Sequence, residues 1–129
     1  MSAPYTVKRL SEAEDAAAKH GHGEMGEARF VTGYLDAERT GVSYHRIRPG
    51  ARQPFGHRHE EAEEIYVVVA GSGRIKLDDD IIELSPLDAV RMAPSVVRNL
   101  EAGPDGLEIL AFGPRHEGDA EMLPGWWSD

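Results

Sequence analysis

The chain has 129 residues, of which 40% are hydrophobic, and this length suits a single domain that buries roughly 65–70% of its unfolded surface. A formal net charge of −9 argues against nucleic acid or an anionic membrane surface as a partner, and the absence of cysteine excludes disulfides and thiolate chemistry. Because no apolar run reaches the length of a signal peptide or a membrane span, we expect a soluble cytoplasmic protein.

Residues 1–27 differ in composition from the rest of the chain and predict an N-terminal arm with one short helix. Ser11 followed by Glu14 fits a capping box, and Gly21 fits the residue that ends a helix, so residues 11–20 are expected to be helical. The apolar side chains of this segment are mostly alanine, which gives the helix little to bury. We therefore expect it to lie exposed against the main domain.

Residues 28–129 show short apolar stretches separated by turn residues, the pattern of an all-β sandwich or barrel. Glycine and aspartate predict tight hairpins at 71–73 and 78–80, and residues 101–106 have the composition of a turn. Strands are expected at residues 28–35, 41–48, 65–70, 74–77, 81–84, 88–92, 97–100 and 107–112.

Two histidines and a glutamate in the middle of the chain form a candidate metal-binding set. If His57 and His59 lie on an extended segment, both imidazoles face the same side, with their Cα atoms ~6.6 Å apart. Glu64 opens the run 64–70, whose β-branched and aromatic residues favour a strand. Two neutral nitrogens and one carboxylate oxygen suit Fe(II), Mn, Ni, Zn or Cu better than Ca or Mg.

Along the strand that begins at Glu64, successive side chains are expected to point to opposite faces of the sheet. Tyr66 is expected on the same face as Glu64, whereas Glu63 should face the other way. An inward Tyr66 either donates a hydrogen bond to a metal-bound ligand or substrate, or is an interior tyrosine whose hydroxyl is satisfied within the protein.

The stretch HRHEEAEEIYVVVAG, which contains these residues, resembles the first motif of the cupin superfamily. Four residues separate His59 from Glu64, and six separate Glu64 from Gly71, as in that motif. The resemblance implies a small cupin jelly roll, an antiparallel β-barrel or sandwich, whose motif residues point inward and hold a metal. It implies His57, His59 and Glu64 as the ligands. Because one-domain cupins commonly pair, we also expect a homodimer.

The second cupin motif normally supplies a third histidine, and residues 87–98 correspond to it only loosely. Arg98 stands where that histidine is expected. Arginine stays protonated and has no lone pair to offer, so it cannot replace an imidazole as a ligand. Either His57, His59 and Glu64 hold a metal alone, as a triad with open positions, or Arg98 pairs with Glu64 and the barrel holds no metal.

The resemblance implies a metalloenzyme, such as a dioxygenase, isomerase or decarboxylase, that acts on a small organic acid. In this interpretation Arg98 anchors a carboxylate or neutralises an oxyanion, and Tyr66 assists. A non-enzymatic binding or sensing module is an alternative. A metal-free barrel whose histidines act as acid or base is another. A structural or storage role ranks last.

Five further residues are interpreted from their surroundings in the sequence. His45 is expected at the surface or at the edge of the core, although it would add a third nitrogen ligand if it turned inward. His20 and His22 lie among glycines and are expected in an exposed loop. Trp126 and Trp127 are expected to pack against a barrel mouth, a neighbouring strand or a dimer partner.

Overall fold

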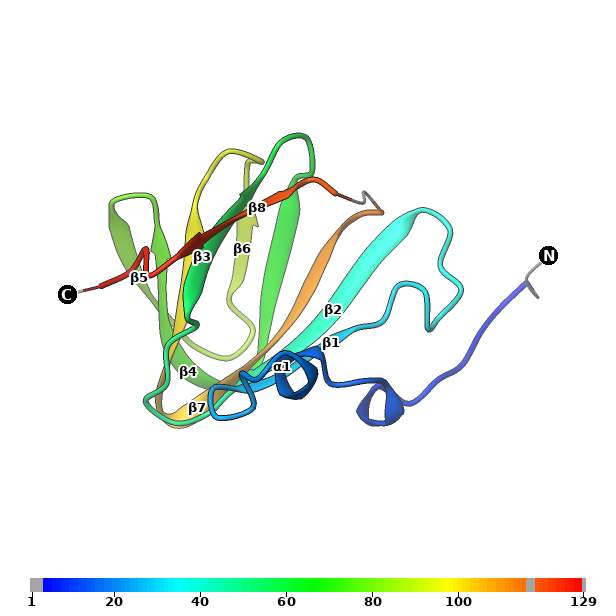
Figure 1. Ribbon diagram of the computed structural model, residues 1–129, viewed down its shortest axis with the longest axis horizontal. Helices are drawn as coiled ribbons and strands as arrows, with labels where there is room; N and C mark the ends of the chain where they lie inside the picture. The colour runs from blue at the N-terminus through cyan, green and yellow to red at the C-terminus, as the bar shows by residue number, and fades with distance from the viewer. Residues whose placement is uncertain (1–3, 116–117, 129) are drawn as a thin grey trace.

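The computed structural model describes residues 4–115 and 118–128, which form an antiparallel sheet curled into a barrel, with a short N-terminal helix against one end (Figure 1). A single turn of 3-10 helix (Leu10–Glu12) precedes the helix α1 (Ala16–Lys19). The strands are β1 (Gly26–Phe30), β2 (Thr40–Ile47), β3 (Phe55–His59), β4 (Glu64–Leu77), β5 (Asp80–Leu84), β6 (Ala89–Met92), β7 (Arg98–Pro114) and β8 (Ala120–Pro124).

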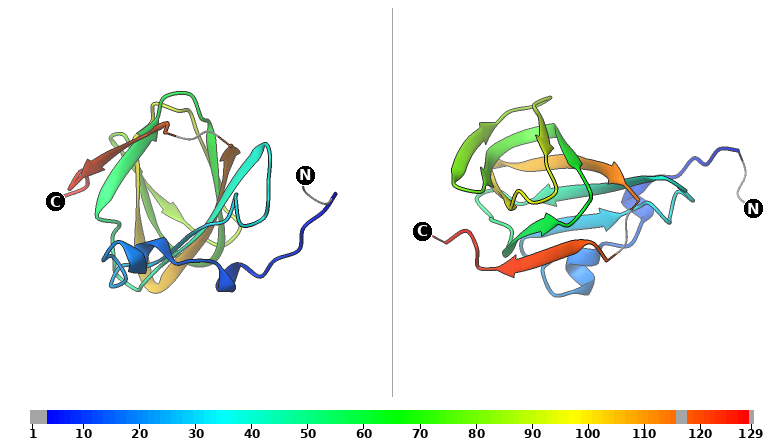
Figure 2. Two further views of the ribbon diagram at one scale, coloured as in Figure 1. Left: turned by 45° about the vertical axis from the view of Figure 1, so that its right-hand side comes forward. Right: turned by 90° about the horizontal axis from the view of Figure 1, so that it is seen from above.

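The two longest strands, β4 and β7, pair with each other along most of their length. On one side of this ladder, β7 continues to β2 and then β1, and it also contacts β3, which pairs with β8. On the other side, β4 pairs with β5 and β6. Figure 2 shows how these strands wrap around a common interior. The interior is filled by fully buried side chains that include Ile47, Val68, Ile75, Leu100 and Ile109.

The hairpin predicted at 71–73 and the turn predicted at 101–106 are both wrong, because β4 and β7 continue through these segments as strands. Gly71 pairs with Leu107 and Gly73 pairs with Ala102, with a register shift between them. Gly71 has a φ of 77°, and a Cβ at this position would lie 2.0 Å from the carbonyl oxygen of Gly106. The glycines therefore bend the ladder and let its backbones approach, and they do not reverse the chain.

The sequence does not predict β3 and β8, and it makes β1 too long. β3 and β8 contain glycine, proline and polar residues and show no apolar alternation, so they carry no strand signal of their own. β1 ends at Phe30, whereas the predicted strand extends to residue 35, because residues 32–37 form a turn in which Asp36 has a φ of 57°. The remaining strands and the hairpin at 78–80 lie where the sequence places them.

The N-terminal helix is shorter than predicted, and its cap is a different residue. Asp15, not Ser11, caps α1 by accepting hydrogen bonds from the backbone N–H groups of Ala17 and Ala18. The same carboxylate accepts from the N–H of Ala28 in β1, and this tertiary contact favours Asp15 over the local capping box. Gly21 follows the helix with a φ of 81°, as predicted. Within the described ranges, no helix has the length and apolar character needed to cross a membrane.

The two tryptophans near the C-terminus pack against neighbouring strands, which is one of the outcomes the sequence allows. Trp127 is buried, and the guanidinium of Arg52 lies over its ring at 4.3 Å. Trp126 lies so close to β3 that a Cβ added at Gly56 would come within 2.8 Å of its ring. The C-terminal segment is therefore held against the outside of the barrel.

The bend at Gly71 predicts a large cost for any side chain there. Gly71→Ala would place a methyl group against the backbone of β7 in a left-handed conformation, so we expect the free energy of unfolding to fall by about 3 kcal/mol or more. Gly50→Ala is the matched control, because Gly50 has a φ of 72° but open space around its Cα. It should cost only about 1–2 kcal/mol. Denaturant titrations of both variants measure the difference, and equal losses would contradict the role of Gly71.

Candidate metal centre

β3 and β4 bring the three predicted ligands together on the inner face of the barrel. The imidazoles of His57 and His59 come from β3, and Glu64 is the first residue of β4. Their ligand atoms all lie within 4.8 Å of one another. Glu64 Oε1 is 3.5 Å from His57 Nε2 and 3.7 Å from His59 Nε2. Two atoms bound tetrahedrally to one ion at ~2.1 Å lie about 3.4 Å apart, so this spacing fits a single metal ion.

The hydrogen bonding of these groups also fits a cation. Both ring nitrogens of His59 and Oε1 of Glu64 are buried without a hydrogen-bond partner among the described residues. Buried polar atoms in proteins are normally paired. His59 Nε2 and Glu64 Oε1 face each other at 3.7 Å, and two acceptor atoms in this position fit a positive ion between them. Nitrogen and carboxylate donors of this kind suit divalent transition metals.

The predicted alternation along β4 is confirmed. Tyr66 is buried on the same side as Glu64, whereas Ile65 between them is 39% exposed. Glu63 lies outside the barrel and forms an exposed ion pair with Arg91 at 3.1 Å. Of the two adjacent glutamates, only Glu64 therefore reaches the metal-competent group.

Arg98 is completely buried and lies directly across from His57 in the pairing of β3 with β7. Its Nη1 is 3.6 Å from Glu64 Oε1, and its Nη2 donates a hydrogen bond to the carbonyl of Ala93. Burial by itself would raise the pKa of Glu64. The imidazoles of His57 and His59 and the guanidinium of Arg98 outweigh burial and hold the pKa of Glu64 well below its usual range. Glu64 is thus kept as a carboxylate.

The triad lies in the wall of a cavity of about 480 Å³. Much of the remaining wall is apolar and includes Met25, Phe30, Phe55 and Met122. A neighbouring cavity of about 420 Å³ also reaches His59 and Glu64, so the group is approached from two directions. Arg98 does not line either cavity. Its guanidinium therefore faces Glu64 Oε1 from outside the cavity lining.

His45 turns into the barrel, which corrects the expectation of a histidine at the surface or core edge. It lines the larger cavity, and its Nε2 is 2.8 Å from the hydroxyl of Ser43, which lies on the same face of β2. The ring of Phe30 meets His45 edge-on at 5.6 Å. Burial lowers the pKa of His45 to about 4, although Glu64 acts in the opposite direction. The alternation of Ser43, His45 and Ile47 could have revealed this inward face.

His20 and His22 also line the larger cavity, which the prediction of an exposed loop missed. His20 is exposed, as expected, but His22 is half-buried and its ring meets Phe55 edge-on at 6.0 Å. These histidines reach the cavity because the turn after α1 folds back over the end of the barrel, an arrangement that local sequence does not show.

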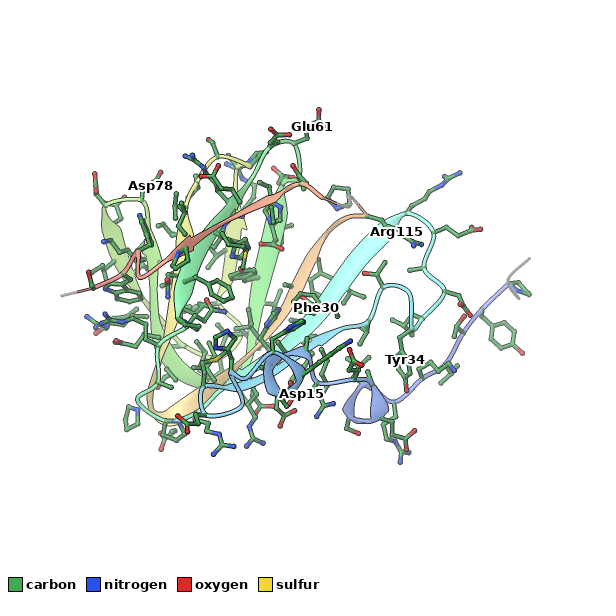
Figure 3. All side chains as sticks on the ribbon, viewed as in Figure 1. Asp15, Phe30, Tyr34, Glu61, Asp78 and Arg115 are labelled. Atoms are coloured by element: carbon green, nitrogen blue, oxygen red, sulfur yellow. The ribbon has the colours of Figure 1, made fainter. Side chains whose placement is uncertain are left out.

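Sequence reasoning missed Asp119 altogether. Its carboxylate accepts hydrogen bonds from the N–H groups of residues 60–62, in the loop between β3 and β4, and lies 3.6 Å from His59 Nδ1. Figure 3 shows that the side chain of Glu61, in the same loop, points away from the barrel. Asp119 lies far from the motif in the sequence, and no spacing rule links it to His59.

No protein-family model matches the sequence, and no curated protein matches it either. Several solved structures, however, are similar to this one. A cupin protein from Bacteroides fragilis is 23% identical, with a TM-score of 0.67, and the alignment covers 99% of this chain and 91% of that one. The polyketide cyclase RemF from Streptomyces resistomycificus is 20% identical, with a TM-score of 0.70, over 95% of this chain and 88% of RemF.

Oxalate decarboxylase from Bacillus subtilis is 20% identical, with a TM-score of 0.76, and covers 95% of this chain; the chain spans 33% of that enzyme. The similar structures also include a lyase and an isomerase-like protein, so they do not point to one activity. At these identities the shared property is the fold. The inward-facing motif of β3 and β4, the curled antiparallel sheet and these structural likenesses together show that the chain has a small cupin-type fold.

Proposed function

We propose that this protein is a metal-dependent cupin that binds and transforms a small organic acid, with His57, His59 and Glu64 as the metal ligands. The observation that carries the proposal is that the ligand atoms of these three side chains lie within 4.8 Å of one another in the wall of a cavity. Among the described residues, Glu64 Oε1 is buried without a hydrogen-bond partner. We expect a divalent transition metal such as Fe, Mn, Ni or Zn. Once bound, the ion would supply a Lewis acid that polarises an oxygen of the substrate.

The charge and the lining of the cavity support an organic acid as the ligand. A divalent ion held by two neutral imidazoles and one carboxylate keeps a net positive charge, which attracts an anion. The apolar side chains opposite the triad fit a hydrocarbon body, and about 480 Å³ is within the usual range of small-molecule sites. Ser43 and His45 form a neutral hydrogen-bonded pair that can bind a further polar group of the ligand.

Tyr66 and Arg98 take separate roles in this proposal. Burial and the neighbouring Glu64 carboxylate raise the pKa of Tyr66 well above its usual range, so its hydroxyl stays protonated. Because Tyr66 lines the cavity, it can donate a hydrogen bond to the ligand. Arg98 is completely buried outside the cavity lining, so we assign it to the ionisation of Glu64 and not to the substrate.

A metal-free binding module is the second candidate, and the buried position of Arg98 favours it. A guanidinium 3.6 Å from Glu64 Oε1 supplies part of the positive charge that an ion would otherwise provide. In this case the histidines would bind the acid directly or exchange protons with it.

The first prediction separates the two candidates by metal content. Protein purified without chelators should contain about one transition metal per chain by elemental mass spectrometry. His57→Ala and Glu64→Gln should each abolish metal retention, since each removes a ligand. Glu63→Gln, the matched control on the opposite face, should retain it. Equal loss in both glutamate variants would contradict the assignment, and no metal in the wild type after incubation with Fe(II), Mn, Ni and Zn would favour the metal-free candidate.

A second prediction concerns the charge balance at Glu64. Arg98→Met removes a buried cation and leaves Glu64 uncompensated, so the metal-free protein should lose about 3–5 kcal/mol in free energy of unfolding. A bound dication would replace the missing charge. The difference in free energy of unfolding between wild type and Arg98→Met should therefore be smaller in saturating Zn(II) than without metal. Arg58→Met is the control, because Arg58 forms an exposed pair with Glu121 and its loss should cost at most about 1 kcal/mol. Denaturant titrations with and without zinc provide the comparison, and a loss that zinc leaves unchanged would argue against shared charge.

A third prediction uses the depressed pKa of His45, about 4 in the folded protein against about 6.5 in an unfolded chain. Between these pH values the unfolded chain binds the proton more readily. The stability from neutral His45 is therefore complete above about pH 6.5 and is lost as the pH falls towards 4. In metal-free protein, His45→Gln should flatten this part of the stability curve, whereas His20→Gln should leave it as in the wild type. Parallel curves for wild type and His45→Gln would rule out a buried neutral His45.

A further inference from the structure

We propose that Asp119 is a positioning residue of the metal centre: its carboxylate orients the imidazole of His59, and the C-terminal strand β8 carries it into place. The inference rests on the proposed metal site for the identity of the bound ion. The orientation of His59 by Asp119 can be tested whether or not an ion binds.

Asp119 is held as a buried carboxylate by the backbone of the loop between β3 and β4. Its side chain is 1% exposed. Oδ1 accepts hydrogen bonds from the N–H groups of Glu60 and Glu61 at 2.6 and 3.1 Å, and Oδ2 accepts from that of Ala62 at 2.9 Å. Three such donors compensate the desolvation of an ionised carboxylate. Asp119 thus closes the loop that connects the two ligand-bearing strands.

The same carboxylate lies behind the ring of His59. Oδ2 is 3.6 Å from His59 Nδ1, while Nε2 on the far side of the ring is 3.7 Å from Glu64 Oε1. A neutral imidazole has one N–H, and a carboxylate beside Nδ1 favours that nitrogen as the protonated one. The lone pair is then left on Nε2, which faces the other ligands. Carboxylates behind metal-bound histidines orient the ring and raise its basicity in this way.

The strand that carries both histidines depends on β8 for its position. Among the described residues, β3 pairs in register with β7 only at His57, opposite Arg98. Along its other edge, all of β3 pairs with β8, from Phe55 opposite Pro124 to His59 opposite Ala120. Beyond β8, Trp126 packs against Gly56 of β3. Metal binding and the docking of β8 should therefore stabilise each other, because coupling between two binding events is reciprocal.

The decisive experiment compares Asp119→Asn with Asp88→Asn. Asp88 is the matched control, since its carboxylate also accepts a backbone hydrogen bond, from Ser85, but on an exposed turn away from the cavity. In titrations against a competing chelator, Asp119→Asn should weaken Zn(II) binding by about 10–100-fold without changing the stoichiometry. Asp88→Asn should bind zinc as the wild type does. Wild-type affinity in Asp119→Asn would overturn the proposal.

Nitrogen NMR of the His59 ring gives a readout that a purely structural role would not change. The wild type should carry the proton on Nδ1, and Asp119→Asn should shift the tautomer towards Nε2. A wild-type ring protonated on Nε2 overturns the proposal without the need for any variant. If the wild type binds none of Fe(II), Mn, Ni and Zn, the proposed function fails, and the tautomer in metal-free protein still decides the role of Asp119.

Hydrogen exchange tests the coupling to β8. Zn(II) should slow amide exchange at residues 120–123 in the wild type. Trp126→Ala, which loosens the C-terminal segment without touching the ligands, should speed that exchange and weaken zinc binding several-fold. Exchange in β8 that does not respond to zinc, in a wild type that binds it, would refute the coupling.

Discussion

The bend in the ladder between β4 and β7 is the constraint on which the rest of the structure depends. A straight strand of the length of β4 would span roughly 45 Å, with Glu64 at one end and the pairing of Leu77 with Arg98 at the other. In the folded chain, Glu64 and Arg98 lie 3.6 Å apart at their charged atoms. The glycines at the register shift allow the close backbone contacts of this bend, and the bend creates an interior in which residues from both ends of the ladder meet.

The chemistry of that interior is organised around a single carboxylate. Two imidazoles and a guanidinium surround Glu64, each with a nitrogen between 3.5 and 3.7 Å from Oε1. An anion in such a place is stabilised by positive charge, and Arg98 supplies it from behind while the cavity side remains available to an ion. The arginine at the position of the usual third cupin histidine therefore keeps Glu64 ionised and leaves the cavity side of the carboxylate open.

The two histidines depend on a part of the chain that is distant in sequence. β3 lies near the edge of the sheet and is held mainly by β8 and by the loop that Asp119 closes. β3 and β8, which show no apolar alternation, therefore lie next to the candidate metal centre, while the ladder of β4 and β7 lies at the middle of the sheet. The proposed centre joins a carboxylate on β4 to two histidines whose orientation, in our proposal, depends on the docking of the C-terminal segment.

The sequence alone determined the features that local backbone geometry controls. The two-residue period of a strand accounts for the shared face of His57 and His59, for the inward face of Tyr66 and for the outward face of Glu63, and each agrees with the structure. The cupin resemblance depends on the same short stretch. These predictions succeed because a strand sets the direction of each side chain within a few residues.

Only the tertiary structure decided the features that depend on contacts between distant segments. The bend at Gly71, in place of a hairpin, is set by pairing with β7. The position of Asp119 behind His59 depends on β8, which has no strand pattern of its own. Such contacts bring together residues that no local period relates, because the free energy that places them comes from burial and pairing across the whole barrel.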